Sequence, residues 1–183
     1  YRGAVPSADA DAPAAPVVAL VGMMGTGKSS VGEVVAQRTG REFVDLDALI
    51  VASTSTSIPE LFGSIGEVGF RAREVAELRV ALDTEQPTVL ATGGGVVTST
   101  EARSLLDRAT VVWLDVDIDT LVERLGDGEG RPMLGDDPRR ALEELLAVRR
   151  ELYAEVADVV VDAGSGTVDQ VADLVMASIG VGV

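Results

Sequence analysis

The sequence contains no cysteine and no histidine. Their absence excludes disulfide bonds, thiolate nucleophiles and zinc sites with thiolate or imidazole ligands, and it removes imidazole as a general base. Catalysis by this chain would have to use carboxylates, arginines, backbone amides or a hard metal cation.

Lysine is almost as rare, because Lys28 is the only one among 183 residues and every other basic side chain is an arginine. A net charge of −15 predicts a surface that repels nucleic acids and anionic membranes, so neither is expected as a partner. No apolar run approaches the about 20 residues of a membrane helix. The first sixteen residues lack the hydrophobic stretch of a signal peptide, and residues 1–15 are interpreted as a disordered lead-in.

The remaining residues, 16–183, have the length of a single domain, and 46% of the chain is hydrophobic. Five short apolar runs predict buried strands, at residues 17–22, 42–47, 88–94, 110–116 and 158–163. Helical patterns lie between and after them, at residues 28–39, 57–83, 99–106 and 138–153 and beyond Thr167. Because the strands are continuously apolar, we expect helices on both faces of a parallel sheet, which is a three-layer α/β fold.

A phosphate-binding motif follows the first predicted strand. Gly22-x-x-x-x-Gly27-Lys28-Ser29 matches the pattern G-x-x-x-x-G-K-[ST] and opens the first predicted helix. In such a loop the backbone N–H groups face a polyphosphate, the lysine reaches the terminal phosphates and the hydroxyl can ligate Mg²⁺. The alternative is a glycine-rich turn with an accidental lysine, which the strand before it and the helix after it make less favourable.

Two aspartates end the second predicted strand, in the segment Phe43-Val44-Asp45-Leu46-Asp47. The period of two of a strand places both on one face, at the edge of the sheet where ligands of open α/β folds bind. One of them could serve Mg²⁺, and the other could orient or deprotonate an attacking hydroxyl. Asp47 could instead only cap a helix that starts at Ala48.

Two arginines fall on apolar helical stripes. Arg71 lies on one of them, with Glu67 and Glu74 placed to hold its guanidinium, and Arg149 lies on the other. The apolar residues of the two stripes are Val68, Val75, Leu78 and Leu82, and Leu142, Leu145, Leu146 and Tyr153. Two inward guanidiniums suggest one planar anion such as a carboxylate, although structural ion pairing inside the domain is the alternative.

Three successive glycines close the third predicted strand, in Thr92-Gly93-Gly94-Gly95. Their bare amides can approach a substrate closely, and such a run is costly in chain entropy unless it serves a purpose. We therefore favour a substrate-binding role over an ordinary turn.

The segment Gly126-Asp127-Gly128-Glu129-Gly130-Arg131-Pro132 predicts a mobile flap with glycine hinges. Closing such a flap would exclude water and bring Arg131 onto a transferring phosphoryl group. A plain solvent loop is the alternative.

Taken together, these segments resemble shikimate kinases. The resemblance rests on GMMGTGKSS, FVDLDALI, SIPELFGSIGEVGFRARE, ATGGGVV, GRPML and LLAVRRELY, in this order, and it spans residues 17 to about 178. It implies a P-loop NTPase fold of the nucleoside-monophosphate-kinase type, with a substrate-binding insertion at residues 48–83 and a lid at residues 124–137. Val51, where a glutamate is frequent, and the acidic Asp127 and Glu129 of the flap depart from the family pattern.

On the nucleotide side, the resemblance implies that ATP and Mg²⁺ are bound mainly by the loop after the first strand. The ATP-binding residues would be Gly25, Thr26, Gly27, Lys28, Ser29, Ser30, Arg124 and Arg131. Ser29 would ligate Mg²⁺, with Asp45 near the metal through water. Arg131 would be the flap arginine, and Arg124 would stack near the adenine.

On the acceptor side, the resemblance implies that Asp47 meets the acceptor hydroxyl and that Arg71 and Arg149 bind the carboxylate of shikimate. Its polar edge would contact Gly93, Gly94 and Gly95. The reaction would transfer the γ-phosphoryl group of ATP to the 3-hydroxyl of shikimate, on the way to chorismate and the aromatic amino acids. The catalytic residues would be Lys28, Asp47 and Arg131. We expect a cytoplasmic monomer, because the reaction depends on ATP and no export signal is found.

Two rival functions fit parts of the sequence. A kinase of the same fold could act on gluconate or on a nucleoside monophosphate, but the two inward arginines and the triple glycine argue against both. A nucleotide-binding regulator could have lost catalysis and kept the flap as a switch. The presence of Asp47 and Arg131 argues against that function.

Overall fold

The computed structural model describes residues 16–126 and 137–181, and a single parallel sheet organises them. Its strands are β1 (Val17–Val21), β2 (Glu42–Asp45), β3 (Thr88–Ala91), β4 (Thr110–Asp115) and β5 (Val159–Asp162). They lie in the order β2-β3-β1-β4-β5. Every residue of the central strand β1 is buried, which accounts for its continuous apolar sequence. The predicted five-stranded parallel sheet is confirmed.

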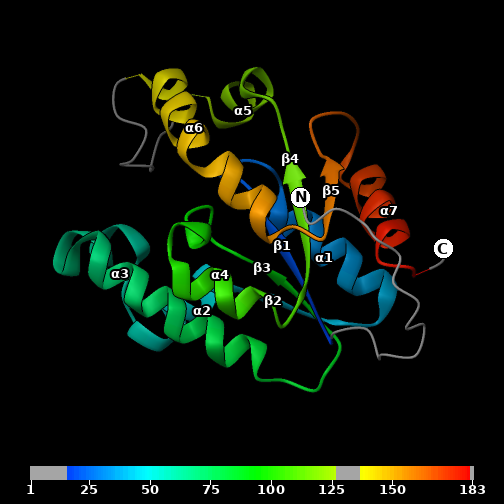
Figure 1. Cartoon of the computed structure of the whole chain (residues 1–183), viewed down its shortest axis with the longest axis horizontal. Helices are drawn as coiled ribbons and strands as arrows, with labels where there is room; N and C mark the ends of the chain where they lie inside the picture. The colour runs from blue at the N-terminus through cyan, green and yellow to red at the C-terminus, as the bar shows by residue number, and fades with distance from the viewer. Residues whose placement is uncertain (1–15, 127–136, 182–183) are drawn as a thin grey trace.

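Helices cover both faces of this sheet (Figure 1). Two of them pack against each other on one face, α1 (Lys28–Thr39) and α7 (Val168–Ser178). The opposite face carries α3 (Ile58–Leu82), α4 (Thr100–Leu106), α6 (Pro138–Val156) and the short 3-10 helix η1 (Val96–Thr98). The remaining helices are α2 (Leu46–Thr54), which packs on α3, and α5 (Ile118–Leu125), which packs on α6. The predicted three-layer arrangement is therefore also confirmed.

Local sequence explains where the first helices begin and end. Gly40 ends α1 in the left-handed conformation, with φ of 68°, as the glycine at this position predicts. Ser57 starts α3 through a capping box with Glu60. Gly32 lets α1 approach the sheet, because a Cβ there would lie 2.7 Å from the ring of Phe43.

The long helix α3 is interrupted at Gly66, whose φ of 67° and ψ of 179° are not helical. The predicted stripe, on a helix from about Gly66 to Asp83, is wrong for Val68, which is 86% exposed. The later members Val75, Leu78 and Leu82 are buried, as predicted.

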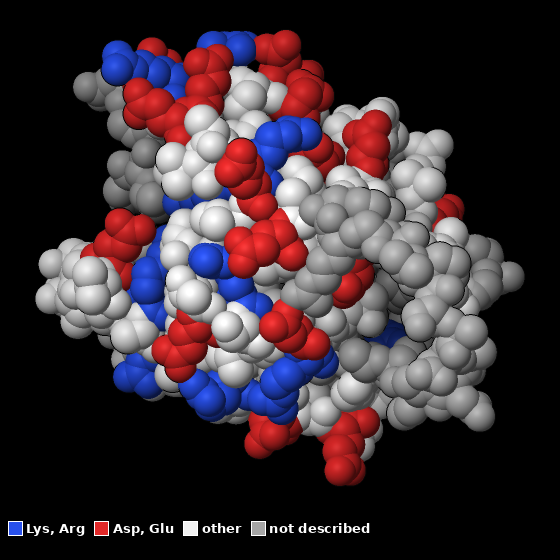
Figure 2. All heavy atoms as spheres, in the orientation of Figure 1, with Lys and Arg blue, Asp and Glu red and all other residues white. Residues whose placement is uncertain are grey.

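Acidic and basic side chains are interspersed over the face that Figure 2 shows, with several basic groups along its lower left. Across residues 16–126 and 137–181, no single helix is long and apolar enough to cross a membrane; α2 and α3 pass such a test only as a pair bent by 93°.

Candidate active site

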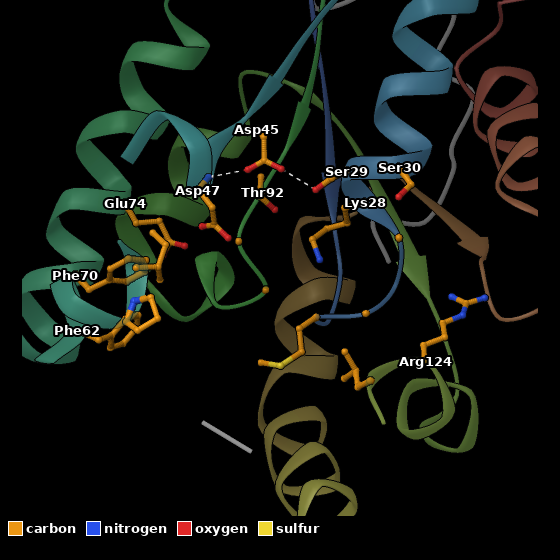
Figure 3. Close-up of a pocket in the computed structure, with 18 of the residues that line it drawn as sticks. Lys28, Ser29, Ser30, Asp45, Asp47, Phe62, Phe70, Glu74, Thr92 and Arg124 are labelled. Atoms are coloured by element: carbon orange, nitrogen blue, oxygen red, sulfur yellow. Dashed lines mark hydrogen bonds between the residues drawn. The ribbon is translucent and has the colours of Figure 1, made fainter. Parts of the chain in front are cut away.

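A cavity of about 590 Å³ opens where β1, β2 and β3 end (Figure 3). Its wall includes the start of α1, the end of β2, the N-terminal part of α3 and the glycines after β3. This is the carboxyl edge of the sheet, where ligands of open α/β folds bind. Among its lining residues are Lys28, Ser29, Asp45, Asp47 and Arg71, so predicted site residues from four different elements meet in one place. Arg149 is not among the residues that line it.

The phosphate loop holds its lysine on its own backbone. Lys28 Nζ donates to the carbonyl oxygens of Gly22 at 2.9 Å and Met23 at 2.8 Å, and the residue is only 8% exposed. Gly25 and Gly27 have φ of 81° and 89°, which favours glycine at both positions. Gly27, the residue that caps α1, contributes no side-chain hydrogen bond, and the first residues of α1 line the cavity. The uncapped N–H groups of such a helix start can bind an anion.

The aspartate pair is arranged differently from the prediction. β2 ends at Asp45 and α2 begins at Leu46, so the expectation that the strand continues to Asp47 is wrong. The cap of α2 is Asp45, whose Oδ1 accepts from the N–H groups of Asp47 at 3.0 Å and Ala48 at 3.2 Å, so the alternative of Asp47 as the cap is wrong too. The physical reason is that the buried Leu46 turns into the core, and the acceptor before it starts the helix early.

Asp47 nevertheless lines the cavity, from the first turn of α2 (Figure 3). The residue as a whole is exposed, although nearby groups desolvate its carboxylate. Burial among these groups raises the pKa of Asp47, and the neighbouring Asp45 raises it further, while Lys28 and Arg71 oppose the shift. A carboxylate with a raised pKa is a better proton acceptor than an ordinary one.

The donor set beside the phosphate loop fits a hard cation. Ser29 Oγ donates to Asp45 Oδ2 at 2.6 Å, which places a hydroxyl and a carboxylate side by side at the start of α1. Oxygen ligands of this kind suit Mg²⁺, which usually shares its coordination sphere with phosphates and water. Within the described residues no group of three or more acidic side chains could hold a metal by itself. A cation here would therefore depend on phosphate oxygens for part of its coordination.

Arg71 is held by both glutamates that the helical spacing predicted. Its Nη1 pairs with Glu74 at 2.7 Å and its Nη2 with Glu67 at 3.5 Å, which confirms the expected ion pairs. The guanidinium carbon also lies 5.9 Å and 5.4 Å from the ring centroids of Phe62 and Phe70, which stack on each other. Sequence reasoning missed these rings, although both flank the kink of α3.

Glu74 is the most buried charged residue of the cavity wall, at 1% exposure. Burial raises its pKa, while Arg71 opposes the shift. Its second oxygen, Oε1, has no hydrogen-bond partner among the described residues. The sequence predicted Glu74 only as an ion-pair partner of Arg71. Helical spacing does not show that the carboxylate of Glu74 packs against Gly93, which has no side chain to displace it. A Cβ on Gly93 would lie 2.6 Å from Glu74 Oε1 and 3.1 Å from Asp47 Oδ1.

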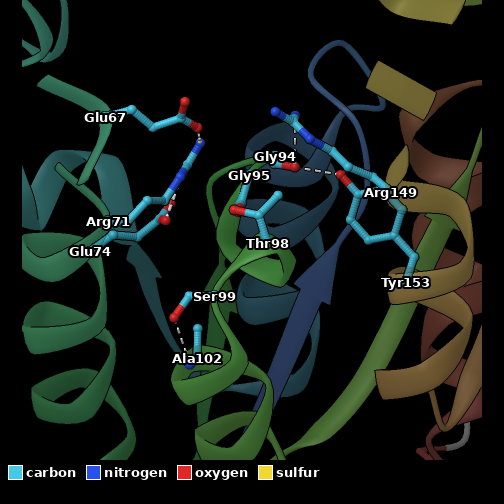
Figure 4. A network of polar contacts seen from close by, with 10 residues as sticks. All are labelled: Glu67, Arg71, Glu74, Gly94, Gly95, Thr98, Ser99, Ala102, Arg149 and Tyr153. Carbon is cyan, nitrogen blue, oxygen red and sulfur yellow. Dashed lines mark hydrogen bonds and ion pairs between the residues drawn. The ribbon is translucent and has the colours of Figure 1, made fainter. Parts of the chain in front are cut away.

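The glycine triplet lies between the two inward arginines (Figure 4). A Cβ on Gly95 would lie 2.1 Å from Arg71 Nη2, so bare backbone is required where this guanidinium rests. On the other side, Arg149 is 3% exposed and its Nη1 donates to the carbonyl oxygen of Gly94 at 3.2 Å. The next residue, Arg150, instead pairs with Asp115 at 2.8 Å.

A second cavity of about 350 Å³ lies on the far side of the phosphate loop, lined by Gly25, Thr26, Arg124 and the segment after β5. Arg124 Nη2 donates to the carbonyl oxygens of Ala163 at 2.8 Å and Gly164 at 3.3 Å. Sequence reasoning missed this segment, although the run DAGSGT is a glycine-rich turn after a strand, which is a usable signal. Arg131 and most of the predicted lid at 124–137 lie outside the described residues.

Comparisons with known proteins agree on one family. The family model described as shikimate kinase matches residues 24–180. A shikimate kinase of Halorhodospira halophila is 47% identical over 84% of this chain and 87% of that protein. A shikimate kinase structure from Acinetobacter baumannii, in complex with shikimate, matches with a TM-score of 0.84 and 37% identity, over 90% of this chain and 93% of that one. A gluconokinase structure from Sinorhizobium meliloti, at 21% identity and a TM-score of 0.63 over 92% of this chain and 94% of that one, shares the fold.

Proposed function

The chain belongs to the shikimate kinase family, and on this premise we propose how its residues divide the work of the family's reaction. That reaction transfers the γ-phosphoryl group of ATP to the 3-hydroxyl of shikimate and yields shikimate 3-phosphate and ADP, in the shikimate pathway. The observation that carries the proposal is that one cavity holds both the phosphate loop and the pair of Asp47 and Arg71. The phosphoryl donor ATP and the acceptor shikimate would be bound in this one cavity next to each other.

The nucleotide would lie along the loop of residues 22–30. Its phosphates would replace the carbonyl oxygens of Gly22 and Met23 as partners of Lys28, and they would face the open N–H groups at the start of α1. Mg²⁺ would be held by Ser29, with Asp45 near it through water, and would neutralise charge on the phosphate oxygens. Gly25, Thr26, Gly27 and Ser30 would complete the binding of ATP.

Shikimate would lie between α3 and α6, against the glycine triplet. Arg71 and Arg149 would bind its carboxylate, because planar guanidiniums bind carboxylates in two-point contacts. This orientation directs the ring hydroxyls toward Asp47, which would align the attacking 3-hydroxyl and accept its proton. The low exposure of Arg149 supports this role, since a buried cation without an anion is costly.

The second cavity would take the adenine base, because it adjoins the phosphate loop at Gly25 and Thr26 and is bordered by Arg124. The flap around residues 124–137 would close over the nucleotide and bring Arg131 to the transferring group. We also propose that residues 16–183 form a single domain with an acceptor-binding insertion at 48–83, and that the protein works as a cytoplasmic monomer.

One assay separates this proposal from its rivals. ADP release would be measured by enzyme coupling, with shikimate, gluconate and AMP offered in turn at equal concentration. We expect release with shikimate only. Release with gluconate or AMP would instead indicate another small-acceptor kinase. Tight ATP binding without release for any acceptor would indicate a regulator that has lost catalysis.

A further inference from the structure

Tyr153 joins Arg149 at a single backbone atom. Its hydroxyl donates to the carbonyl oxygen of Gly94 at 2.5 Å, and Arg149 Nη1 donates to the same oxygen (Figure 4). The two side chains are four residues apart on α6, so they project from the same face of the helix. Tyr153 is fully buried, at 0% exposure, and the stripe on α6 gave it only an apolar packing role.

The other carbonyl groups of the triplet are also engaged, but within the local turn. The Gly93 oxygen accepts from the N–H of Val96 at 3.2 Å. The Gly95 oxygen accepts from the N–H of Thr98 at 3.0 Å and from its hydroxyl at 2.7 Å. The Gly94 oxygen differs because both of its donors come from α6.

The direction of the Gly94 carbonyl fixes the direction of one N–H group. In a trans peptide the C=O and the following N–H point in opposite directions. The Gly94 carbonyl points toward α6, so the N–H of Gly95 points toward α3, where the guanidinium of Arg71 rests on Gly95. No partner for this N–H is found within residues 16–126 and 137–181.

We propose that Tyr153 is a positioning residue for the acceptor, because its hydroxyl holds the Gly94–Gly95 peptide so that the Gly95 N–H joins Arg71 and Arg149 around the acceptor's carboxylate. The inference rests on the proposed function. Tyr153 itself does not touch the acceptor.

The surroundings of Tyr153 suit a fixed donor. Its ring stacks on Trp113 of β4, with centroids 5.7 Å apart and planes at 26°, so the hydroxyl is held from the central sheet. Burial raises the pKa of Tyr153, an effect that Arg149 opposes only in part, so the hydroxyl keeps its proton and remains a donor. Without the hydroxyl, Arg149 alone would hold the Gly94 carbonyl.

The test is Tyr153→Phe, which removes the hydroxyl and keeps the ring on Trp113. We expect KM for shikimate to rise about fivefold, the effect of one net hydrogen bond, with KM for ATP and kcat within about twofold of wild type. Emission of Trp113, the single tryptophan of the chain, and the melting temperature report whether the core is intact. If Tyr153 had a purely structural role, its replacement would lower stability but would not raise KM for shikimate selectively over KM for ATP.

Two controls isolate the hydroxyl. Thr98→Val removes a hydroxyl that donates to the Gly95 carbonyl oxygen. The N–H group of that peptide is the N–H of Val96, which already donates to the Gly93 oxygen. KM for shikimate should therefore stay near wild type. Global replacement of tyrosine by 3-fluorotyrosine changes only Tyr1 and Tyr153, and it keeps a hydroxyl donor in place even if the Phe variant fails to fold. Its KM for shikimate should not rise.

The inference is overturned if Tyr153→Phe folds and leaves KM for shikimate unchanged, or if KM for shikimate and KM for ATP rise together in that variant. It is also overturned if Thr98→Val raises KM for shikimate as much as Tyr153→Phe does. A rise in KM for shikimate with 3-fluorotyrosine would also overturn it. These outcomes are distinct from failure of the proposed function, in which the wild-type protein would not phosphorylate shikimate at all.

Discussion

The two halves of the cavity are built in different ways. The proposed phosphate-binding half comes mainly from one continuous stretch, residues 22–30, and uses backbone N–H groups, a helix start and one lysine. The proposed acceptor half is lined by Asp47, Arg71, Gly93 and Gly94, which belong to different elements and meet only when the sheet and its helices are in place. Gly95 and Arg149 lie next to these residues, against Arg71 and the Gly94 carbonyl, and are not among those that line the cavity. On the proposed function, phosphate binding is therefore encoded mainly by local sequence, whereas selection of the acceptor depends on the tertiary structure.

The strongest test of the local half is Lys28→Ala. The charge that lies over the terminal phosphates would be lost, and we expect kcat to fall roughly a thousandfold, the scale seen when one preorganised electrostatic contact is removed. Single-turnover kinetics would measure it. Arg38→Ala, on the exposed side of the same helix, is the control and should leave kcat unchanged. A near-normal rate for Lys28→Ala would refute the role of the phosphate loop.

The junction of the two halves is tested by Asp47→Asn, for which we expect kcat to fall about a hundredfold through loss of the proton acceptor. Asp47 acts when deprotonated, and its pKa is raised above 3.8. For the wild type, kcat/KM should therefore rise as pH increases through that raised pKa and then level off. The asparagine variant should lack this acidic limb. If its pH profile kept the limb, another group would be the base.

The acceptor half is tested by Arg71→Lys, which keeps the charge and loses the planar fork. We expect KM for shikimate to rise about tenfold, with KM for ATP unchanged, because a two-point charged contact becomes a single one. Arg73→Lys is a matched control on the same helix, since Arg73 is exposed and pairs with Glu77. An equal change in both KM values would show that the halves are not separable.

The smallest effect is expected for Arg124→Ala, on the nucleotide side. The variant loses a contact with the base and the hydrogen bonds to Ala163 and Gly164. KM for ATP should rise about threefold and KM for shikimate should not change. Steady-state kinetics with each substrate varied would measure this, and a selective effect on shikimate would reverse the assignment of the second cavity.

Sequence reasoning succeeded where the determinants are local. The strands, the helix α1 with its end at Gly40, and the phosphate loop follow from residues next to one another, and the ion pairs of Arg71 follow from helical spacing. The family resemblance is confirmed by the family model and by the identity to its relatives.

Sequence reasoning failed where the position of a side chain depends on contacts with an element far away in the sequence. β2 ended two residues early, where Leu46 is buried, and Val68 is exposed although its helical stripe is buried further along α3. The rings around Arg71, the burial of Glu74 against Gly93 and the bond from Tyr153 to Gly94 each join segments far apart in the chain. No periodicity within one segment contains that information.

The central claim is that donor and acceptor occupy the two halves of one cavity at the same time. Crystallography of the protein with shikimate and a non-hydrolysable ATP analogue tests it most directly. We predict the 3-hydroxyl within about 2.6–3.2 Å of an Asp47 oxygen, facing the γ-phosphate, with the carboxylate between Arg71 and Arg149. Shikimate bound elsewhere, or turned with its carboxylate toward Asp47, would contradict the account.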